Sequence, residues 1–246
     1  MKNFIQKFFN FLGYEISRID TLYKNNFEFK ALLNEVSEYT MTSNLRIFAL
    51  YQSIKYIINN KIEGDIVECG VWKGGSMMLV AKMLKKVNLI KTLYLYDTFE
   101  GMTNPGEFDY ASNLKKNKNN HASMLIKRDS NLLCLSSLDE VMNNLFSTNY
   151  EKSRINFIKG DVKDTLQRDT PSNISLLRLD TDWYESTLIE LNTLYPKLNK
   201  GGIIIIDDYE SWEGCKKAVD EYFKFHKDIY FHRIDDHAIL GVKLHK

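Results

Sequence analysis

Four aspartates follow two strongly apolar runs of the sequence, and their spacing suggests that they act together. Asp180 and Asp182 end the segment "SLLRLDTD", and Asp207 and Asp208 end "GIIIIDD". Residues two apart in an extended segment point the same way, so the first pair can face one site. Carboxylates gathered at one place repel each other unless a cation neutralises them. A hard divalent ion, Mg²⁺ first, is the expected occupant, whereas in the alternative these aspartates are separate helix caps.

The elements that would position these aspartates can be recognised from the pattern of apolar residues. From about residue 60, short apolar runs ("DIVECG", "TLYLYD", "INFIKG", "SLLRLD", "GIIIID") alternate with helical patterns. The predicted helices cover residues 43–60, 75–86, 137–146, 185–195 and 212–226. This alternation predicts parallel strands joined by helices, and all-apolar blocks are typical of strands covered on both faces. Two final strand-like runs around "DD" in "DIYFHRIDDHAILGVKL" predict a closing hairpin.

A glycine-rich turn follows the first predicted strand, in "VECGVWKGGS". Gly70, Gly74 and Gly75 allow a tight turn that brings a ligand close to the next helix. A dinucleotide fingerprint needs glycine at the position of Trp72, and a P-loop needs lysine at the position of Ser76, so neither motif is present. The turn is compatible with a smaller adenosyl ligand, although strand-to-helix turns also use glycine for structural reasons.

Two further aspartates end predicted strands at the same edge, where ligands of open parallel sheets bind. Asp97 ends "LYLYD" and can accept hydrogen bonds from a ribose diol. Asp161 follows "INFIKG" and can reach an adenine amino group. For each, the alternative is an aspartate that caps the following helix.

Four blocks of the chain resemble the TylF/macrocin-type sugar O-methyltransferases, which use S-adenosylmethionine. These blocks are "GDIVECGVWKGGS", "LYDTFEGM", "LRLDTDWYEST" and "GGIIIIDDYESWEGCKKAVDEY", in the family's order, and the resemblance extends from Thr42 to the C-terminus. It implies an α/β, Rossmann-like class I methyltransferase fold. The expected sheet is mostly parallel and seven-stranded, with a terminal antiparallel hairpin and an N-terminal helical extension.

The same resemblance assigns roles to individual residues. It implies that Asp180, Asp207 and Asp208 are metal ligands and that Asp182 is the general base. The residues expected to bind the cofactor are Glu68, Gly70, Val71, Gly74, Ser76, Asp97, Thr98, Phe99, Asp161, Val162 and Asp180. Contacts to the acceptor are expected from Tyr184, Glu185 and Tyr209. Trp183 stands where the family pattern has a smaller apolar residue, which puts acceptor contacts in question more than the chemistry.

The chain divides into an N-terminal helical extension, residues 1–60, and a methyltransferase domain, residues 61–246. Apolar residues from Phe4 to Leu12 recur at helical spacing and predict an amphipathic helix that packs on the domain or on a second subunit; attachment to a membrane surface is the alternative. The polar segment 104–121 is predicted to be either a disordered loop or a lid over the site.

Composition narrows the class of protein. A formal net charge of +1 gives no bulk attraction to nucleic acid, and the N-terminal apolar residues are too interrupted for a membrane span. Cys69, Cys134 and Cys215 lack CxxC spacing, which favours a reducing cytoplasm and argues against a thiolate zinc site.

The predicted function is therefore an S-adenosylmethionine- and Mg²⁺-dependent (or other divalent-metal-dependent) O-methyltransferase acting on a sugar hydroxyl. The acceptor is a nucleotide-activated sugar, a surface-polysaccharide sugar or a glycosylated natural product, and the Lys-, Asn- and Ile-rich composition shifts the expectation toward the first two. A metal-dependent glycosyltransferase is the alternative, because "DTD" matches its Asp-x-Asp motif. That class leaves the glycine turn and the second aspartate pair unexplained. A further alternative is a non-catalytic scaffold protein, but such a protein would have no need to keep the acidic cluster.

Overall fold

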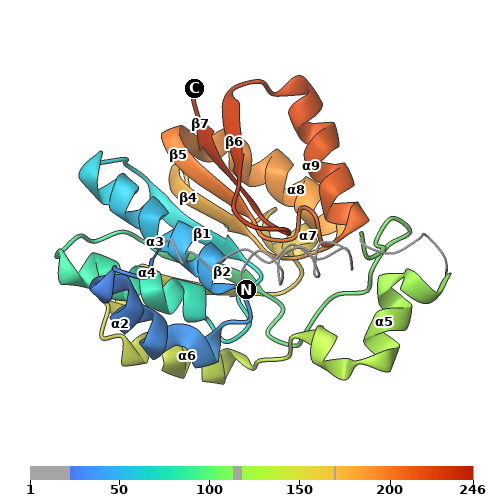
Figure 1. Ribbon diagram of the computed structural model, residues 1–246, viewed down its shortest axis with the longest axis horizontal. Helices are drawn as coiled ribbons and strands as arrows, with labels where there is room; N and C mark the ends of the chain where they lie inside the picture. The colour runs from blue at the N-terminus through green and yellow to red at the C-terminus, as the bar shows by residue number, and fades with distance from the viewer. Residues whose placement is uncertain (1–22, 113–117, 169, 246) are drawn as a thin grey trace, which may run out of the picture.

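One mixed sheet runs through the computed structural model, which describes residues 23–112, 118–168 and 170–245 (Figure 1). Its strand order is β3-β2-β1-β4-β5-β7-β6. The first five strands pair in parallel, and β7 is antiparallel to both β5 and β6. The expected seven-stranded sheet with a terminal hairpin is therefore confirmed. The strands are β1 (Asp65–Cys69), β2 (Leu93–Asp97), β3 (Ile155–Lys159), β4 (Ile174–Leu179), β5 (Leu198–Ile206), β6 (Ile229–Arg233) and β7 (Ile239–Lys243).

Helices cover both faces of the sheet (Figure 1). One face carries α2 (Phe27–Val36), α3 (Asn44–Asn59), α4 (Gly75–Lys86) and α6 (Leu138–Ser147). The other carries α7 (Val162–Thr165), α8 (Tyr184–Leu194) and α9 (Glu213–Phe225), while α5 (Ala122–Arg128) lies apart from the sheet. Short 3₁₀ helices are η1 (Ser37–Tyr39), η2 (Lys118–Asn120), η3 (Ser130–Leu133), η4 (Lys152–Arg154) and η5 (Tyr195–Lys197).

Local sequence signals explain where the helices begin. The Ser43 hydroxyl accepts a hydrogen bond from the Arg46 amide and caps α3. Ser137 caps α6 in the same way, through the Glu140 amide. Gly74 precedes α4 with a φ of 87°, a left-handed conformation that glycine adopts without steric cost. Helix α4 has the predicted bounds.

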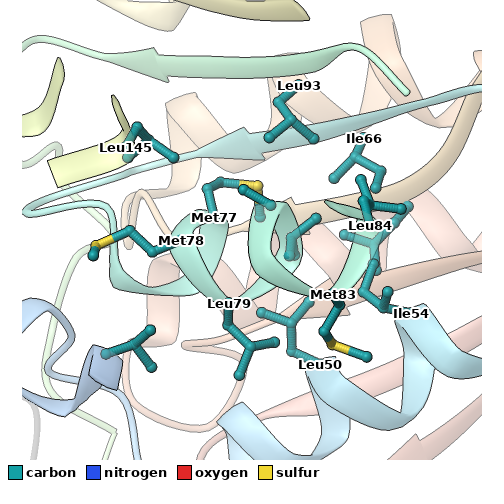
Figure 2. Packing of buried hydrophobic residues seen from close by; sticks show 14 of the residues in the cluster. Leu50, Ile54, Ile66, Met77, Met78, Leu79, Met83, Leu84, Leu93 and Leu145 are labelled. Carbon is teal, nitrogen blue, oxygen red and sulfur yellow. The ribbon is translucent and has the colours of Figure 1, made fainter. Parts of the chain in front are cut away.

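The helix α4 joins the N-terminal helices to the sheet through one hydrophobic core. Figure 2 shows Leu50 and Ile54 of α3 packed on one side of α4, with Ile66 of β1 and Leu93 of β2 on the other. These four side chains are at most 1% exposed. Full burial of each aliphatic side chain contributes about 1.5–3 kcal/mol. Helix α3 therefore packs in the same core as the sheet that follows it.

Two of the sequence-based predictions fall outside the described residues. The amphipathic pattern from Phe4 to Leu12 is one, and residues 113–117 of the polar segment are the other. Within the described ranges, no helix combines the length and hydrophobicity needed to cross a bilayer.

Candidate active site

The carboxyl ends of the five parallel strands surround a cavity of about 230 Å³, here called the strand-end cavity. Residues at or just after the ends of all five strands line it: Gly70 after β1, Asp97 at the end of β2, Asp161 after β3, Asp180 and Asp182 after β4, and Asp207 and Asp208 after β5. The structure thus brings all six predicted aspartates to one place. Residues 39–42, which join η1 to α3, line the cavity as well.

Two glycines of the turn after β1 are required by close approaches of the backbone. Gly70 has a φ of 82°, and a Cβ atom there would lie 2.0 Å from the Asp180 carbonyl oxygen. A Cβ on Gly75 would lie 2.5 Å from the carbonyl oxygen of Tyr39. The glycine turn is therefore held between the end of β4 and the segment that precedes α3.

Asp97 ties the loops after β1 and β2 together. Its Oδ2 accepts hydrogen bonds from the amides of Val71, at 2.6 Å, and Trp72, at 3.1 Å. Its Oδ1 accepts one from the Phe99 amide at 2.7 Å. The carboxylate lines the cavity, but in this structure it organises the turn through backbone donors. A ribose hydroxyl would have to share these oxygens with the backbone.

Asp161 takes the capping role that was one of its two alternatives, and it does so at the rim of the cavity. Its Oδ1 accepts a hydrogen bond from the Lys163 amide at 2.9 Å and so caps α7. The residue also lines the strand-end cavity, next to Gly160 and Val162. Capping fixes the direction of the side chain at the rim of the cavity.

Asp180, Asp207 and Asp208 form an acidic triad. One carboxylate oxygen from each lies within 4.8 Å of the other two. Burial, and then repulsion by neighbouring carboxylates, raises the pKa of both Asp180 and Asp208 well above the ordinary aspartate value. The triad therefore has an excess of negative charge that protons or a divalent cation can relieve.

Asp207 differs from the other two because two arginines compensate its charge, whereas Asp180 pairs, among the described residues, with Arg178 alone. Oδ2 of Asp207 accepts from Arg46 at 2.7 Å and from the Thr42 hydroxyl at 2.8 Å, and its Oδ1 lies 3.0 Å from Nη2 of Arg178. Burial alone would raise the pKa of Asp207, but Arg178 and Arg46 hold it below the ordinary value. Asp207 is thus ionised at neutral pH.

Glu68 lies behind the cavity instead of on its surface. The side chain is 1% exposed, and its Oε1 is 2.8 Å from Nη1 of Arg178, which also donates to Asp180 at 2.8 Å. Burial raises the pKa of Glu68 to about 8. The carboxyl group of Glu68 therefore acts on the site through Arg178, and a direct cofactor contact is not what this geometry provides.

Asp182 lines the cavity beside the triad, on an unusual backbone. Its φ is 66°, in the left-handed region that non-glycine residues rarely adopt. Burial raises the pKa of Asp182 to about 7, while its hydrogen bond with Asp208 opposes the shift. A carboxylate with a pKa near neutrality has the basicity that a proton acceptor needs.

The remaining predicted residues are divided between the cavity and the surface around it. Val71, Ser76, Thr98 and Val162 line the cavity. Gly74 and Phe99 belong to the two loops but are outside the lining. The three residues expected to contact the acceptor are bound to partners away from the cavity: the Tyr184 hydroxyl to Glu221, Glu185 to Lys163, and the Tyr209 hydroxyl to Asp220.

The polar segment after β2 is attached to the start of α8. Asp109 is fully buried, and its two oxygens accept from the amides of Tyr184, at 2.9 Å, and Gly106, at 2.6 Å. The Trp183 indole donates to the Thr103 carbonyl at 3.0 Å. The described part of the segment is therefore docked beside Asp182. No pattern around Asp109 indicates a buried anchor.

Arg46 and Arg178 are functional residues that sequence reasoning missed. Arg178 did carry a signal, because a charge inside the apolar run "SLLRLD" must be paired when the strand is buried. Arg46 carried no such signal, since arginines are common on the exposed surfaces of helices. Its partner is 161 residues away in the chain.

The fold and the site together define a class. A sheet of order β3-β2-β1-β4-β5-β7-β6, with a glycine turn after β1 and acidic residues at the next strand ends, is that of a class I methyltransferase. Residues 31–240 match the model of the family described as Macrocin-O-methyltransferase (TylF), and the chain belongs to this family. It is thus an O-methyltransferase that uses S-adenosylmethionine, and the glycosyltransferase and scaffold alternatives are set aside.

Relatives of known activity support this assignment. The chain is 35% identical over 185 residues to the demethyldecarbamoylnovobiocin O-methyltransferase of Streptomyces niveus, covering 75% of this chain and 67% of the relative. It is 30% identical to a tetracenomycin-C 4'-O-methyltransferase of Streptomyces olivaceus, whose substrate carries a dimethoxyrhamnosyl group, with the same coverage. The solved structure of the O-methyltransferase NovP matches with a TM-score of 0.73 and 31% identity, covering 85% of this chain and 83% of NovP.

Proposed function

We propose that this O-methyltransferase acts on a sugar hydroxyl, with a divalent cation held by Asp180, Asp207 and Asp208, and with Asp182 as the proton acceptor. The observation that carries the proposal is the acidic triad itself, whose ligand oxygens lie within 4.8 Å of one another beside the glycine turn. Oxygen-only ligation of this kind suits Mg²⁺.

The residues around the triad fit a cation. Two arginines, Arg46 and Arg178, compensate Asp207, whereas Asp180 and Asp208 retain raised pKa values. When bound, S-adenosylmethionine supplies the methyl group, and the cation lowers the pKa of the acceptor hydroxyl. The protein supplies the three carboxylates, fixed by strand ends and by Arg178. Glu68 holds Arg178 in place from behind.

Asp182 would take the proton from the acceptor hydroxyl as the new bond to carbon forms. It lines the same cavity as the triad and has a pKa near 7, so it is basic enough to accept a proton and largely free to do so above neutral pH. General base catalysis typically contributes about 10² to 10⁴ in rate.

The acceptor that the relatives favour is a sugar carried by a larger natural product. The name of the Streptomyces olivaceus relative describes methylation of a compound that carries a rhamnosyl group, and that of the Streptomyces niveus relative describes methylation of a novobiocin precursor. We extend this substrate class to the present chain, in preference to the nucleotide-activated and polysaccharide sugars suggested by composition. A panel containing all three kinds of acceptor, assayed with labelled S-adenosylmethionine, would distinguish them.

The base assignment is tested with Asp182→Asn. Turnover should fall by about 10² or more, while the affinity for S-adenosylhomocysteine measured by calorimetry stays within a few-fold of wild type. Asp139→Asn, an exposed change in the first turn of α6, is the matched control and should behave as wild type. Retention of most activity by Asp182→Asn would remove Asp182 from the mechanism.

A further inference from the structure

The turn that carries Asp182 is tighter than an ordinary strand-to-helix connection. The Trp183 amide donates to the Thr181 carbonyl at 2.7 Å, across Asp182, whose φ is 66°. A hydrogen bond from residue i+2 to residue i around a positive φ is a γ-turn of the rare, strained kind. Such conformations persist only where surrounding contacts impose them.

The contacts that impose this turn come from the first turns of α8. The Thr181 hydroxyl donates to Oε1 of Glu190 at 2.9 Å. The Ser186 hydroxyl lies 3.3 Å from the Thr181 carbonyl and 3.1 Å from the Trp183 carbonyl. Both residues that flank Asp182 are therefore held to the helix that follows them.

Glu190 is an unexpected residue at its position. It is fully buried on the core-facing side of α8, together with Leu191 and Leu194. Burying a carboxyl group costs free energy that an apolar side chain at this position would avoid. Glu190 does not belong to the cavity lining, so contact with cofactor or acceptor does not explain it. The Cys69 thiol also interacts with this carboxyl group, but the interaction that reaches the turn of Asp182 is the hydrogen bond from Thr181.

We infer that Glu190 is a positioning residue, which holds Asp182 in its left-handed conformation through the side chain of Thr181. The inference rests on the proposed role of Asp182 as proton acceptor. Without the hydrogen bond, Thr181 can rotate, the γ-turn can relax, and the Asp182 carboxylate moves away from the acceptor hydroxyl. Misplacement of a reacting group by about 1 Å can cost up to about 10² in rate.

The test compares Glu190→Met with Glu190→Gln. Burial raises the pKa of Glu190 to about 8, so its carboxyl group is mainly neutral at pH 7, and glutamine preserves both its shape and its acceptor oxygen. Glu190→Met should lose roughly tenfold to a hundredfold in kcat, with the KM for S-adenosylmethionine and the affinity for S-adenosylhomocysteine within threefold of wild type. Glu190→Gln should retain kcat within threefold.

Thermal unfolding separates positioning from general stability. Because methionine removes a buried polar group, the Tm of Glu190→Met should be equal to that of wild type or higher. Full kcat in Glu190→Met, or an equal loss in both variants, would overturn the inference. So would a kcat loss that follows a lowered Tm and disappears on assay at a lower temperature.

A second pair of variants acts on the other end of the hydrogen bond and covers the case in which Glu190→Met does not fold. Thr181→Val should reproduce the kcat loss, and Thr181→Ser should not. The double variant Glu190→Met/Thr181→Val should be no slower than the slower single variant, since both remove one interaction. Losses of kcat that add up in the double variant would contradict the positioning role of Glu190. If Asp182→Asn is active, the proposed base is wrong; if it is inactive while Glu190→Met is fully active, only the positioning role fails.

Discussion

Nη1 of Arg46 lies 2.7 Å from Oδ2 of Asp207, which joins the first turn of α3 to the end of β5. Nε of the same guanidinium group lies 2.8 Å from Asp235, in the connection between β6 and β7. Arg46 therefore links the helices that precede the sheet to the acidic triad and to the terminal hairpin. Its side chain is 13% exposed, so solvent screens these ion pairs only weakly.

Replacement of Arg46 should expose this link. Arg46→Met leaves Asp207 and Asp235 without their shared cation, and the free energy of unfolding should fall by about 3 kcal/mol. Chemical denaturation measures this change. Mg²⁺ should raise the Tm of the variant more than that of wild type, because the ion would compensate the released charge of Asp207. Arg46→Lys is the control and should lose less. If Mg²⁺ raised the Tm of wild type and of Arg46→Met equally, the ion would not be compensating the charge of Asp207.

Binding of Mg²⁺ should release protons. Because the pKa values of Asp180 and Asp208 are raised well above the ordinary aspartate value, these carboxyl groups hold their protons more strongly than ordinary aspartates do when no cation is bound. A cation needs the ionised form, so affinity should increase as pH rises. Calorimetric titrations at pH 7 in buffers of different ionisation enthalpy give the number of protons released. Heats that are identical in all buffers would show that the triad is already ionised.

The buried acid Glu190 should make stability depend on pH. Its pKa is raised to about 8 in the folded protein, from 4.5 as the reference value. The contribution of protonated Glu190 to the free energy of unfolding is therefore fully present below about pH 4.5 and is lost as pH rises through about 8. One proton gives a slope of at most about 1.4 kcal/mol per pH unit. In urea unfolding, Glu190→Gln should gain stability relative to wild type between pH 5 and 8. If the free energies of unfolding of wild type and Glu190→Gln changed in parallel with pH, the raised pKa of Glu190 would be contradicted.

Loss of the buried anchor Asp109 should loosen the segment that docks on α8. Asp109→Ala leaves the amides of Tyr184 and Gly106 without their acceptor, at a cost of about 1–3 kcal/mol. We expect the KM for the acceptor to rise several-fold and the affinity for S-adenosylhomocysteine to stay unchanged. Trypsin should cleave faster after Lys127 and Arg128, at the end of α5. Asp109→Asn keeps one acceptor oxygen and should be intermediate. Unchanged acceptor kinetics in Asp109→Ala would show that docking is not needed for turnover.

Periodicity and strand ends predicted the part of the fold that depends on local patterns. Helix α4 has the predicted bounds because a capping glycine, an apolar stripe and terminal lysines agree. The apolar block at residues 203–206 indicated a strand buried on both faces, and it forms the buried C-terminal end of β5. Helix α2 lies inside the predicted N-terminal helical extension, although its bounds were not predicted. Helices α5 and α7 were not predicted, since segments of seven and four residues are too short to show an apolar period.

The acidic residues were predicted because strand ends meet at one edge, but their partners were not. Sequence alone predicted that Asp97 can accept hydrogen bonds from a ribose diol, but it did not show that the same oxygens accept from the amides of Val71, Trp72 and Phe99. Backbone donors have no sequence signature. The pairing of Arg46 with Asp207, likewise, depends on how α3 docks on the sheet, which no local pattern encodes.

The contact between Gly70 and the Asp180 carbonyl makes one position of the chain intolerant of every replacement. With a φ of 82° and only 2.0 Å to that oxygen from a would-be Cβ atom, even alanine would push the two loops apart. One of these loops is the glycine turn after β1, and the other carries Asp180 and Asp182. In a library of all substitutions selected for methyl transfer, codon 70 should therefore return glycine, while neighbouring Val71 tolerates other small apolar residues.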